Sequence, residues 1–263
     1  MKYYRFPRGS DSLQDRRIDT LIDCLENKLK IETTDQLDPN GIYFVGGPIS
    51  SYDQLTKLKE NNIRFINIDK GYFRNRKATS HWRLTFNKLQ QDELTQFKDN
   101  NNRLNAFEIE LKDWKKDGEY ILILAPNDEP CQFITGKTPL EWALETRREL
   151  LKHTDRKIFI RYKDFVKKGY DPFEKYLDNC YAVVTLQSVG ALVSTIHGIP
   201  CINLAETCTD AIYKNKLEDI ENLVYPDNRE ELLNSLAYCQ FLPVELENGF
   251  AVKTLEEING SFK

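Results

Sequence analysis

Four short apolar runs, separated by longer polar segments, recur in the second half of the chain and limit the folds that it can adopt. They cover residues 120–125, 157–162, 181–186 and 201–204. The segments between them, with helices expected over 139–152, 172–178 and 187–197, are long enough to cross from one strand to the next. Buried strands that alternate with helices are typical of a doubly wound parallel sheet. We therefore predict an α/β lobe with helices on both faces of its sheet.

A similar but shorter pattern occurs in the first half. Residues 42–45 and 64–68 are apolar runs, and the amphipathic segment 50–61 lies between them. A strand, a helix and a strand within about 30 residues form a parallel βαβ unit. We thus expect two Rossmann-like lobes with mostly parallel sheets, covering 1–115 and 116–235. The tail, 236–263, is rich in apolar residues and is expected to return to the first lobe as a packed helix.

Composition limits the cellular location and the metal chemistry that we expect. The net charge of the 263 residues is −4, and no apolar run approaches the roughly 20 residues of a membrane span. The first residues lack the apolar stretch of a signal peptide, so the cytoplasm is the expected location. Six scattered cysteines and three histidines show no metal-ligand spacing, and we predict no metal site and reduced thiols.

Ligands of doubly wound sheets bind beyond the carboxyl ends of the strands. There, Gln187, Ser188, Val189 and Gly190 follow a strand and open a helix, which makes backbone N–H groups available to an anion. A serine cap with a packing glycine would give the same sequence. Arg161 and Lys163 end the preceding strand, either as solvated charges or as partners of an anion. Together these residues indicate a diphosphate pocket.

The first lobe has its own candidates at strand ends. Gly46 and Gly47 allow a ligand to approach the backbone, and a simple turn explains them equally well. Asp69 is a candidate general base, with a turn cap as the alternative, and His81 is a second titratable candidate.

Residues 70–83 form a basic run without an acidic residue. Its aromatic and basic side chains suit base stacking and phosphate neutralisation. The alternative is a solvated loop with its aromatic residues packed beneath it. The candidate contacts are Tyr72, Arg74, Arg76, Trp82 and Arg83.

The segment 183–200, Val-Val-Thr-Leu-Gln-Ser-Val-Gly-Ala through His-Gly-Ile-Pro, resembles the second lobe of GT-B-type glycosyltransferases, as does Ile160-Arg161-Tyr162-Lys163 before it. The segments 68–85 and 229–241 are similar to bacteriophage proteins of the same general kind.

The resemblance implies a metal-independent transferase with a nucleotide-sugar donor, expected to be UDP-linked, in the second lobe and an acceptor over the first. Arg161 and Lys163 would meet the diphosphate, Ser188 and Gly190 a phosphate, and the Glu206 region the ribose or sugar. A phage enzyme would modify a hydroxymethylated base in DNA in the host cytoplasm, whereas the acidic pI leaves a polysaccharide or small-molecule acceptor open. Two alternatives from other classes are a non-catalytic protein that sequesters a nucleotide or nucleotide sugar, and an assembly protein.

Overall fold

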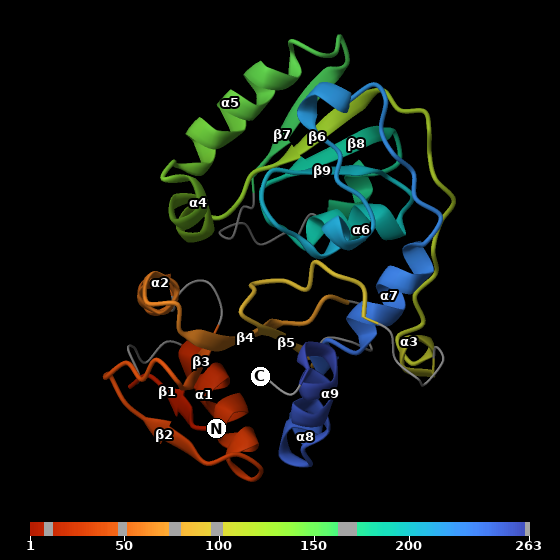
Figure 1. Ribbon diagram of the computed structural model, residues 1–263. Coiled ribbons are helices and arrows are strands. Elements are labelled where there is room, and N and C mark those ends of the chain that lie inside the picture. The colour runs from red at the N-terminus through yellow and green to blue at the C-terminus, as the bar shows by residue number, and fades with distance from the viewer. Residues whose placement is uncertain (8–12, 47–51, 74–79, 96–101, 163–172, 261–263) are drawn as a thin grey trace. The chain divides into compact units, whose positions relative to one another are not determined.

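The protein is a mixed α/β molecule that divides into two compact units (Figure 1). The computed structural model describes residues 1–7, 13–46, 52–73, 80–95, 102–162 and 173–260. Unit 1 comprises Met1–Gln91, Thr95–Glu108 and Asn234–Lys263, and unit 2 comprises Asp92–Leu94 and Ile109–Leu233. The expected fold class, two Rossmann-like lobes with mostly parallel sheets, is confirmed.

The described strands of unit 1 form a six-stranded sheet in the order β10-β5-β4-β3-β1-β2. Four of them are parallel, and β5 and β10 add to one edge in antiparallel fashion. The strands are β1 (Tyr3–Arg5), β2 (Ile31–Thr33), β3 (Ile42–Gly46), β4 (Arg64–Lys70), β5 (Trp82–Phe86) and β10 (Gln240–Phe241). Of these strands, only β3 and β4 were predicted from the sequence.

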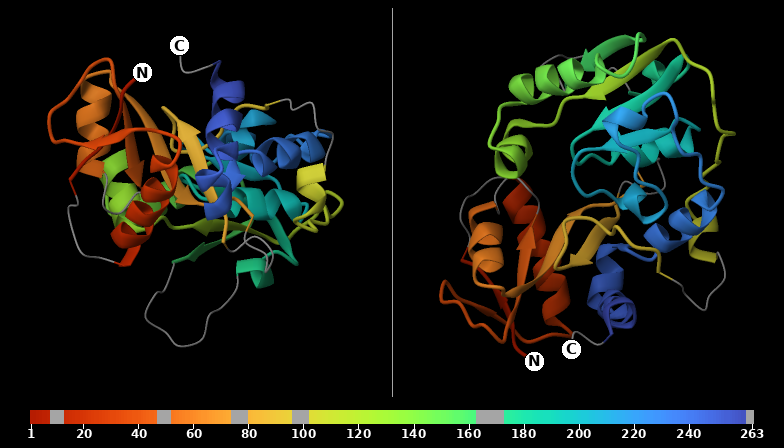
Figure 2. Two further views of the ribbon diagram at one scale, coloured as in Figure 1. Left: turned by 90° about the horizontal axis from the view of Figure 1, so that it is seen from below. Right: turned by 45° about the horizontal axis from the view of Figure 1, so that its top comes forward.

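One face of this sheet carries the apolar core of unit 1. Helix α1 (Leu13–Glu26) buries Ile18, Leu21 and Leu25 against it, and the C-terminal helices α8 (Pro243–Glu247) and α9 (Phe250–Asn259) join the same core. Figure 2 shows α8 and α9 beside α1. The C-terminal segment therefore packs on the first unit, as its apolar content predicted. Two further helices of unit 1 are α2 (Tyr52–Glu60), which packs along β4, and α3 (Asn102–Asn105).

The described strands of unit 2 form a four-stranded, all-parallel sheet in the order β7-β6-β8-β9. They are β6 (Tyr120–Leu124), β7 (Lys157–Arg161), β8 (Cys180–Thr185) and β9 (Cys201–Asn203). Every residue of β8 is buried, which explains its continuous apolar sequence. These four strands coincide with the four apolar runs of the sequence.

Helices cover both faces of the sheet of unit 2 (Figure 1). Helix α4 (Asp128–Thr135) and helix α5 (Pro139–Leu150) contribute Cys131, Trp142 and Leu150 to the core on one face, and α6 (Gly190–Ile196) packs against β8 and β9. Helix α7 (Arg229–Ala237) carries the chain from unit 2 back to unit 1. The helix expected over 172–178 is a short 3-10 turn, Phe173–Tyr176.

Both units contain four parallel strands in the same spatial order. The order β2-β1-β3-β4 in unit 1 matches the order β7-β6-β8-β9 in unit 2. In each set, the strand that comes first in the sequence has the second strand on one side and the third and fourth strands on the other. Such a reversal leaves a crevice beyond the carboxyl ends of the two strands that flank it. In unit 2 these strands are β6 and β8.

Among the described residues, no helix combines the length and the apolar character needed to cross a membrane.

Candidate functional site

The carboxyl ends of β6 and β8 are the first candidate site, because the strand order of unit 2 reverses between them. The backbone leaves β8 through Leu186–Gly190, a turn in which Gln187, Ser188 and Gly190 are half-buried and Val189 is buried. Since β6 and β8 are neighbouring parallel strands, this turn lies beside the residues that follow Leu124. Topology therefore places the Gln187–Gly190 segment where a Rossmann-like sheet binds its ligand.

Gly190 has a packing reason to be glycine. A Cβ atom there would lie 2.7 Å from Cδ1 of Leu124, closer than van der Waals contact allows. The Ser188 hydroxyl accepts a hydrogen bond of 3.0 Å from the N–H of Gly190. The packing role considered for Gly190 is thus present, whereas the cap of α6 is Val189 and has no side-chain hydrogen bond, so Ser188 is not the helix cap. Phosphate binding by the same residues stays a prediction.

Arg161 ends β7 at the same edge of the sheet. It pairs in register with Leu124 of β6, and its backbone oxygen accepts from the N–H of Ala125 at 3.0 Å. The guanidinium lies 5.5 Å from the ring centroid of Tyr176 and is half-buried. Glu206 is exposed in the loop after β9, and Lys163 lies outside the described residues. Three strands of one sheet therefore end at the same edge, where they carry Arg161, Gln187–Gly190 and Glu206.

Two buried cysteines of unit 2, Cys180 and Cys201, are poor nucleophiles. Burial raises the pKa of the Cys180 thiol to about 12 and that of Cys201 to about 11. Both thiols are therefore protonated at neutral pH, and the thiolate is the reactive form.

In unit 1, the parallel register places Gly46 beside Ile68, so Gly46 and Asp69 lie at one edge of the sheet. A Cβ at Gly46 would come within 2.1 Å of Cγ2 of Ile18. The close approach of α1 to the sheet thus accounts for this glycine. Gly47 lies outside the described residues.

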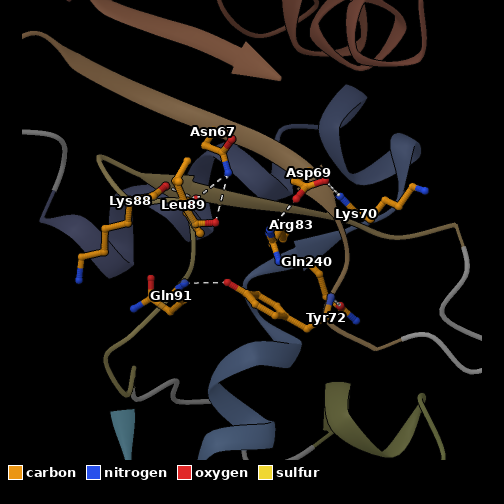
Figure 3. A network of polar contacts seen from close by, with 10 residues as sticks. Asn67, Asp69, Lys70, Tyr72, Arg83, Lys88, Leu89, Gln91 and Gln240 are labelled. Carbon is orange, nitrogen blue, oxygen red and sulfur yellow. Dashed lines mark hydrogen bonds and ion pairs between the residues drawn. The ribbon is translucent and has the colours of Figure 1, made fainter. Parts of the chain in front are cut away.

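Asp69 belongs to a polar network on the face of the sheet opposite the apolar core (Figure 3). Ile66 and Ile68 point into that core, so the alternating residues Asn67 and Asp69 point away from it. One carboxylate oxygen of Asp69 accepts from Nη2 of Arg83 at 2.5 Å, and the other accepts from the N–H of Lys70 at 2.7 Å. The side chains of Asp69 and Arg83 are 16% and 7% exposed, so this is a mostly buried ion pair whose carboxylate retains access to solvent.

The C-terminal segment completes this network. Gln240 of β10 pairs with Arg83 of β5, and its Oε1 accepts from the N–H groups of Tyr72 at 2.7 Å and Phe73 at 3.1 Å. A Cβ on Gly71 would lie 2.8 Å from the same oxygen, so only glycine leaves room for this contact. The Gln240 side chain therefore fixes the backbone that follows Asp69 and Lys70.

Further polar contacts extend the network toward residue 91 (Figure 3). The Tyr72 hydroxyl accepts from the N–H of Gln91 at 2.7 Å, and Asn67 donates to the backbone oxygen of Leu89 at 3.3 Å. None of Asn67, Gln91 and Gln240 was among the site residues predicted from the sequence. For Asn67 alone the sequence held a clue, because this polar residue stands between two apolar isoleucines of a predicted strand and is buried in the structure.

In the described part of the basic run, the aromatic and arginine side chains pack within unit 1. Tyr72 and Arg83 are buried, and the Arg83 guanidinium lies 5.2 Å from the centroid of the Tyr72 ring. Trp82 packs against the apolar core, and the half-buried ring of His81 meets Phe107 edge-on at 4.9 Å. These aromatic rings are packed as the loop alternative requires, whereas Arg74 and Arg76 lie outside the described residues.

Comparison with known proteins finds no match among family models and none among curated proteins. Two solved structures from Thermosulfurimonas dismutans are similar at low identity. The β-Kdo 2,7 transferase KpsC has 13% identity and a TM-score of 0.47, over 90% of this chain and 99% of that chain. The β-Kdo 2,4 transferase KpsC has 11% identity and a TM-score of 0.41, over 90% of this chain and 98% of that chain.

Proposed function

We propose that the protein is a glycosyltransferase whose donor, a nucleotide sugar, binds to unit 2 beyond the carboxyl ends of β6 and β8. The observation that carries this proposal is the reversal of strand order between these two strands, with the Leu186–Gly190 turn at the crevice. Arg161, at the same edge, supplies a cation for the phosphates of the donor. The resemblance of residues 183–200 to GT-B enzymes supports a sugar nucleotide over other nucleotides.

The proposed chemistry moves the sugar from the nucleotide to an acceptor hydroxyl. Asp69, whose carboxylate is held by Arg83 and by the Lys70 N–H, takes the proton of that hydroxyl. The acceptor oxygen then bonds to the anomeric carbon, and the bond from this carbon to the phosphate oxygen breaks, so that the nucleotide leaves with the electron pair. Positive charge at the phosphates stabilises the leaving group without a metal ion. His81 is the second base candidate.

The burial of Tyr72 and Arg83 favours a sugar or small-molecule hydroxyl over a DNA base as acceptor, because these two side chains are not available for stacking on a nucleobase. A DNA acceptor would depend on Arg74 and Arg76. Salt-sensitive binding of duplex or single-stranded DNA that is lost in Arg74→Glu/Arg76→Glu would favour the DNA acceptor instead.

Calorimetry tests the donor site with UDP, GDP, CMP and their sugars. For the nucleotide that binds, Arg161→Ala should weaken affinity about 10- to 100-fold, as expected for loss of a charged hydrogen bond. Arg147→Ala, which removes an exposed arginine of α5 in the same unit, is the matched control and should bind like the wild type. Equal affinity of the Arg161 variant and the control would place the phosphates elsewhere.

Turnover separates the enzyme from the sequestering protein. The enzyme consumes the sugar nucleotide, by transfer or slow hydrolysis, and Asp69→Asn abolishes consumption while the donor still binds. Tight binding without consumption, by the wild type and in the presence of glycan acceptors, would favour the non-catalytic alternative.

A further inference from the structure

Asn203, the last residue of β9, has a side-chain oxygen that calls for a hydrogen-bond donor. Its Nδ2 donates to Oγ1 of Thr209 and to Oδ1 of Asp210, each at 2.8 Å. Because a carboxylate only accepts hydrogen bonds, the contact with Asp210 fixes which end of the amide is the nitrogen. Among the residues that the structure describes, the buried Oδ1 of Asn203 has no hydrogen-bond partner. A buried acceptor without a donor is costly, so its presence in the fold needs an explanation.

The loop after β9 holds this amide in place. The second carboxylate oxygen of Asp210 accepts from the N–H of Thr207 at 3.0 Å, and the hydroxyls of Thr207 and Thr209 lie 3.0 Å apart. Both threonines are fully buried, whereas Asn203 is half-buried. The amide cannot turn its oxygen toward a new donor without breaking both contacts of its nitrogen. Such a fixed group is suited to selective contact with a ligand.

The register of the sheet places Asn203 in line with the crevice of unit 2. Asn203 pairs with Thr185 of β8, and Thr185 pairs with Leu124 of β6, so the three residues form one row across the sheet. The start of α6 lies over this row, because a Cβ on Gly190 would meet the side chain of Leu124. Two strand spacings, about 10 Å, separate Asn203 from Leu124. That distance is within the length of a sugar nucleotide.

Two further contacts show that the Asn203 side chain lies on the α6 face beside the turn after β8. Cys201, two residues earlier and so on the same face, donates from Sγ to the backbone oxygen of Ala191 at 3.0 Å. Ala191 belongs to the first turn of α6, and Asn203 is one step nearer the carboxyl edge than Cys201. Beyond the strand, the N–H of Ala205 donates to the oxygen of Leu186 at 2.8 Å.

We propose, on the basis of the donor site proposed for unit 2, that Oδ1 of Asn203 accepts a hydrogen bond from a hydroxyl of the sugar nucleotide and so selects the donor. An ionised phosphate offers no hydrogen to an acceptor. The groups next to the diphosphate are the ribose and the transferred sugar, and both carry hydroxyls. A ligand that lacks the matching hydroxyl leaves a buried oxygen unpaired in the complex, which is the strongest basis for rejecting an analogue. Glu206, suggested for this contact by the family resemblance, is exposed.

Calorimetry on the full chain tests this contact in two arms, for whichever of UDP, GDP and CMP binds. The ribose arm compares that nucleotide with its 2′-deoxy and 3′-deoxy counterparts. The sugar arm compares its sugar nucleotide with forms that lack one hydroxyl of the sugar. Wild type should bind one of these analogues about tenfold or more weakly than the parent compound, and the arm in which this occurs identifies the ribose or the sugar. Equal affinity for every analogue would overturn the role of Asn203.

A pair of variants separates recognition from a structural role. Asn203→Ala should bring the Kd ratio of analogue to parent below about threefold, because no buried acceptor is left unpaired by the analogue. Thr209→Val is the matched control, since it removes a contact of the amide nitrogen while Asp210 still holds the amide, and it should keep the wild-type ratio. A structural role of Asn203 would weaken both ligands alike, so an unchanged ratio in Asn203→Ala would overturn the proposal.

The same titrations distinguish this proposal from the donor site on which it rests. If none of UDP, GDP, CMP and their sugars binds to the wild type, the donor site is wrong and the role of Asn203 is wrong with it. If one of them binds and Arg161→Ala weakens it, but no analogue is rejected, the donor site stands and only the role of Asn203 is overturned.

Discussion

Arg103 joins the C-terminal segment to the rest of unit 1, and its removal should destabilise that unit strongly. Its guanidinium forms a two-pronged ion pair with Glu245 at 2.6 and 2.9 Å and donates to the backbone oxygens of Ala237 and Gln240 at 2.6 Å each. The ring of Phe250 lies 5.2 Å from its central carbon. The side chains of Arg103 and Glu245 are only 15% and 17% exposed.

Arg103→Ala leaves a mostly buried carboxylate and two carbonyl groups without their donor. Breaking a buried ion pair by removing one partner costs about 3–5 kcal/mol when both groups are fully buried. Partial exposure lowers that cost, and the two lost carbonyl contacts add about 1 kcal/mol each. We therefore expect the free energy of unfolding of unit 1 to fall by about 3–5 kcal/mol. Arg103→Lys keeps the charge but not the fork, and should lose about half as much.

Hydrogen exchange in a urea series, read by mass spectrometry, gives separate values for peptides of each unit. Peptides from α1 and β4 in unit 1 should lose protection in Arg103→Ala, and peptides from β6 and β8 in unit 2 serve as the internal control. A loss below about 1 kcal/mol in unit 1 would refute the view that this cation holds the C-terminal segment.

The same pair predicts a dependence on pH. Burial raises the pKa of Glu245, but the bonds from Arg103 and from the Leu242 N–H outweigh it, and the pKa lies below its ordinary value. A lowered native pKa adds stability that is fully present above the unfolded-state pKa and is lost as pH falls through the native value. Wild type should therefore lose more stability than Glu245→Gln between about pH 6 and pH 3. Parallel pH profiles of the two proteins would contradict this.

Three further predictions concern other parts of the chain. Gly198 and Gly136 both have positive φ, but a Cβ on Gly198 would come within 2.0 Å of the Asp113 backbone oxygen, whereas one on Gly136 meets nothing within 4 Å. In thermal unfolding, Gly136→Ala should lower the free energy of unfolding by about 1 kcal/mol, and Gly198→Ala should lower it by at least twice as much. Equal losses of stability in the two variants would contradict a role of the clash. Gln240→Ala should leave nucleotide affinity unchanged but lower the rate of sugar transfer about tenfold or more, because the backbone after Asp69 loses its acceptor; an unchanged rate would separate this glutamine from catalysis. Treatment with EDTA should leave donor consumption unchanged, and a loss that Mg²⁺ or Mn²⁺ restores would show a metal requirement.

The strands and helices with strong local signals were predictable from sequence. The runs at 120–125, 157–162 and 181–186 became β6, β7 and β8. β8 is buried on both faces and is apolar throughout, whereas the edge strand β7 leaves Lys157 and Phe159 exposed. The C-terminal helices were expected on the first unit because their apolar residues need a core to join. The edge of the sheet that carries Arg161 and Gln187–Gly190 followed from the strand–helix alternation alone.

The shortest strands could not be recognised from the sequence. β10 has two residues and β1 and β2 have three each, too few for an alternation pattern, and their existence depends on partners elsewhere in the chain. For the same reason the sequence left Tyr72 open between stacking on a nucleobase and packing beneath a solvated loop. Its burial is decided by contacts that long-range pairing of β4, β5 and β10 creates.

Sequence by itself thus determined which segments are apolar enough to be strands and which residues follow them. Only the tertiary structure decided which polar groups meet. Gln240 binds the Tyr72 N–H across a separation of 168 residues, and Arg103 binds Glu245 across 142. Hydrophobic periodicity reports whether a residue faces the core, but it contains no information on which distant polar group lies opposite. The network around Asp69 joins side chains and backbone of β4, β5 and β10, so it emerges only when the sheet of unit 1 is assembled.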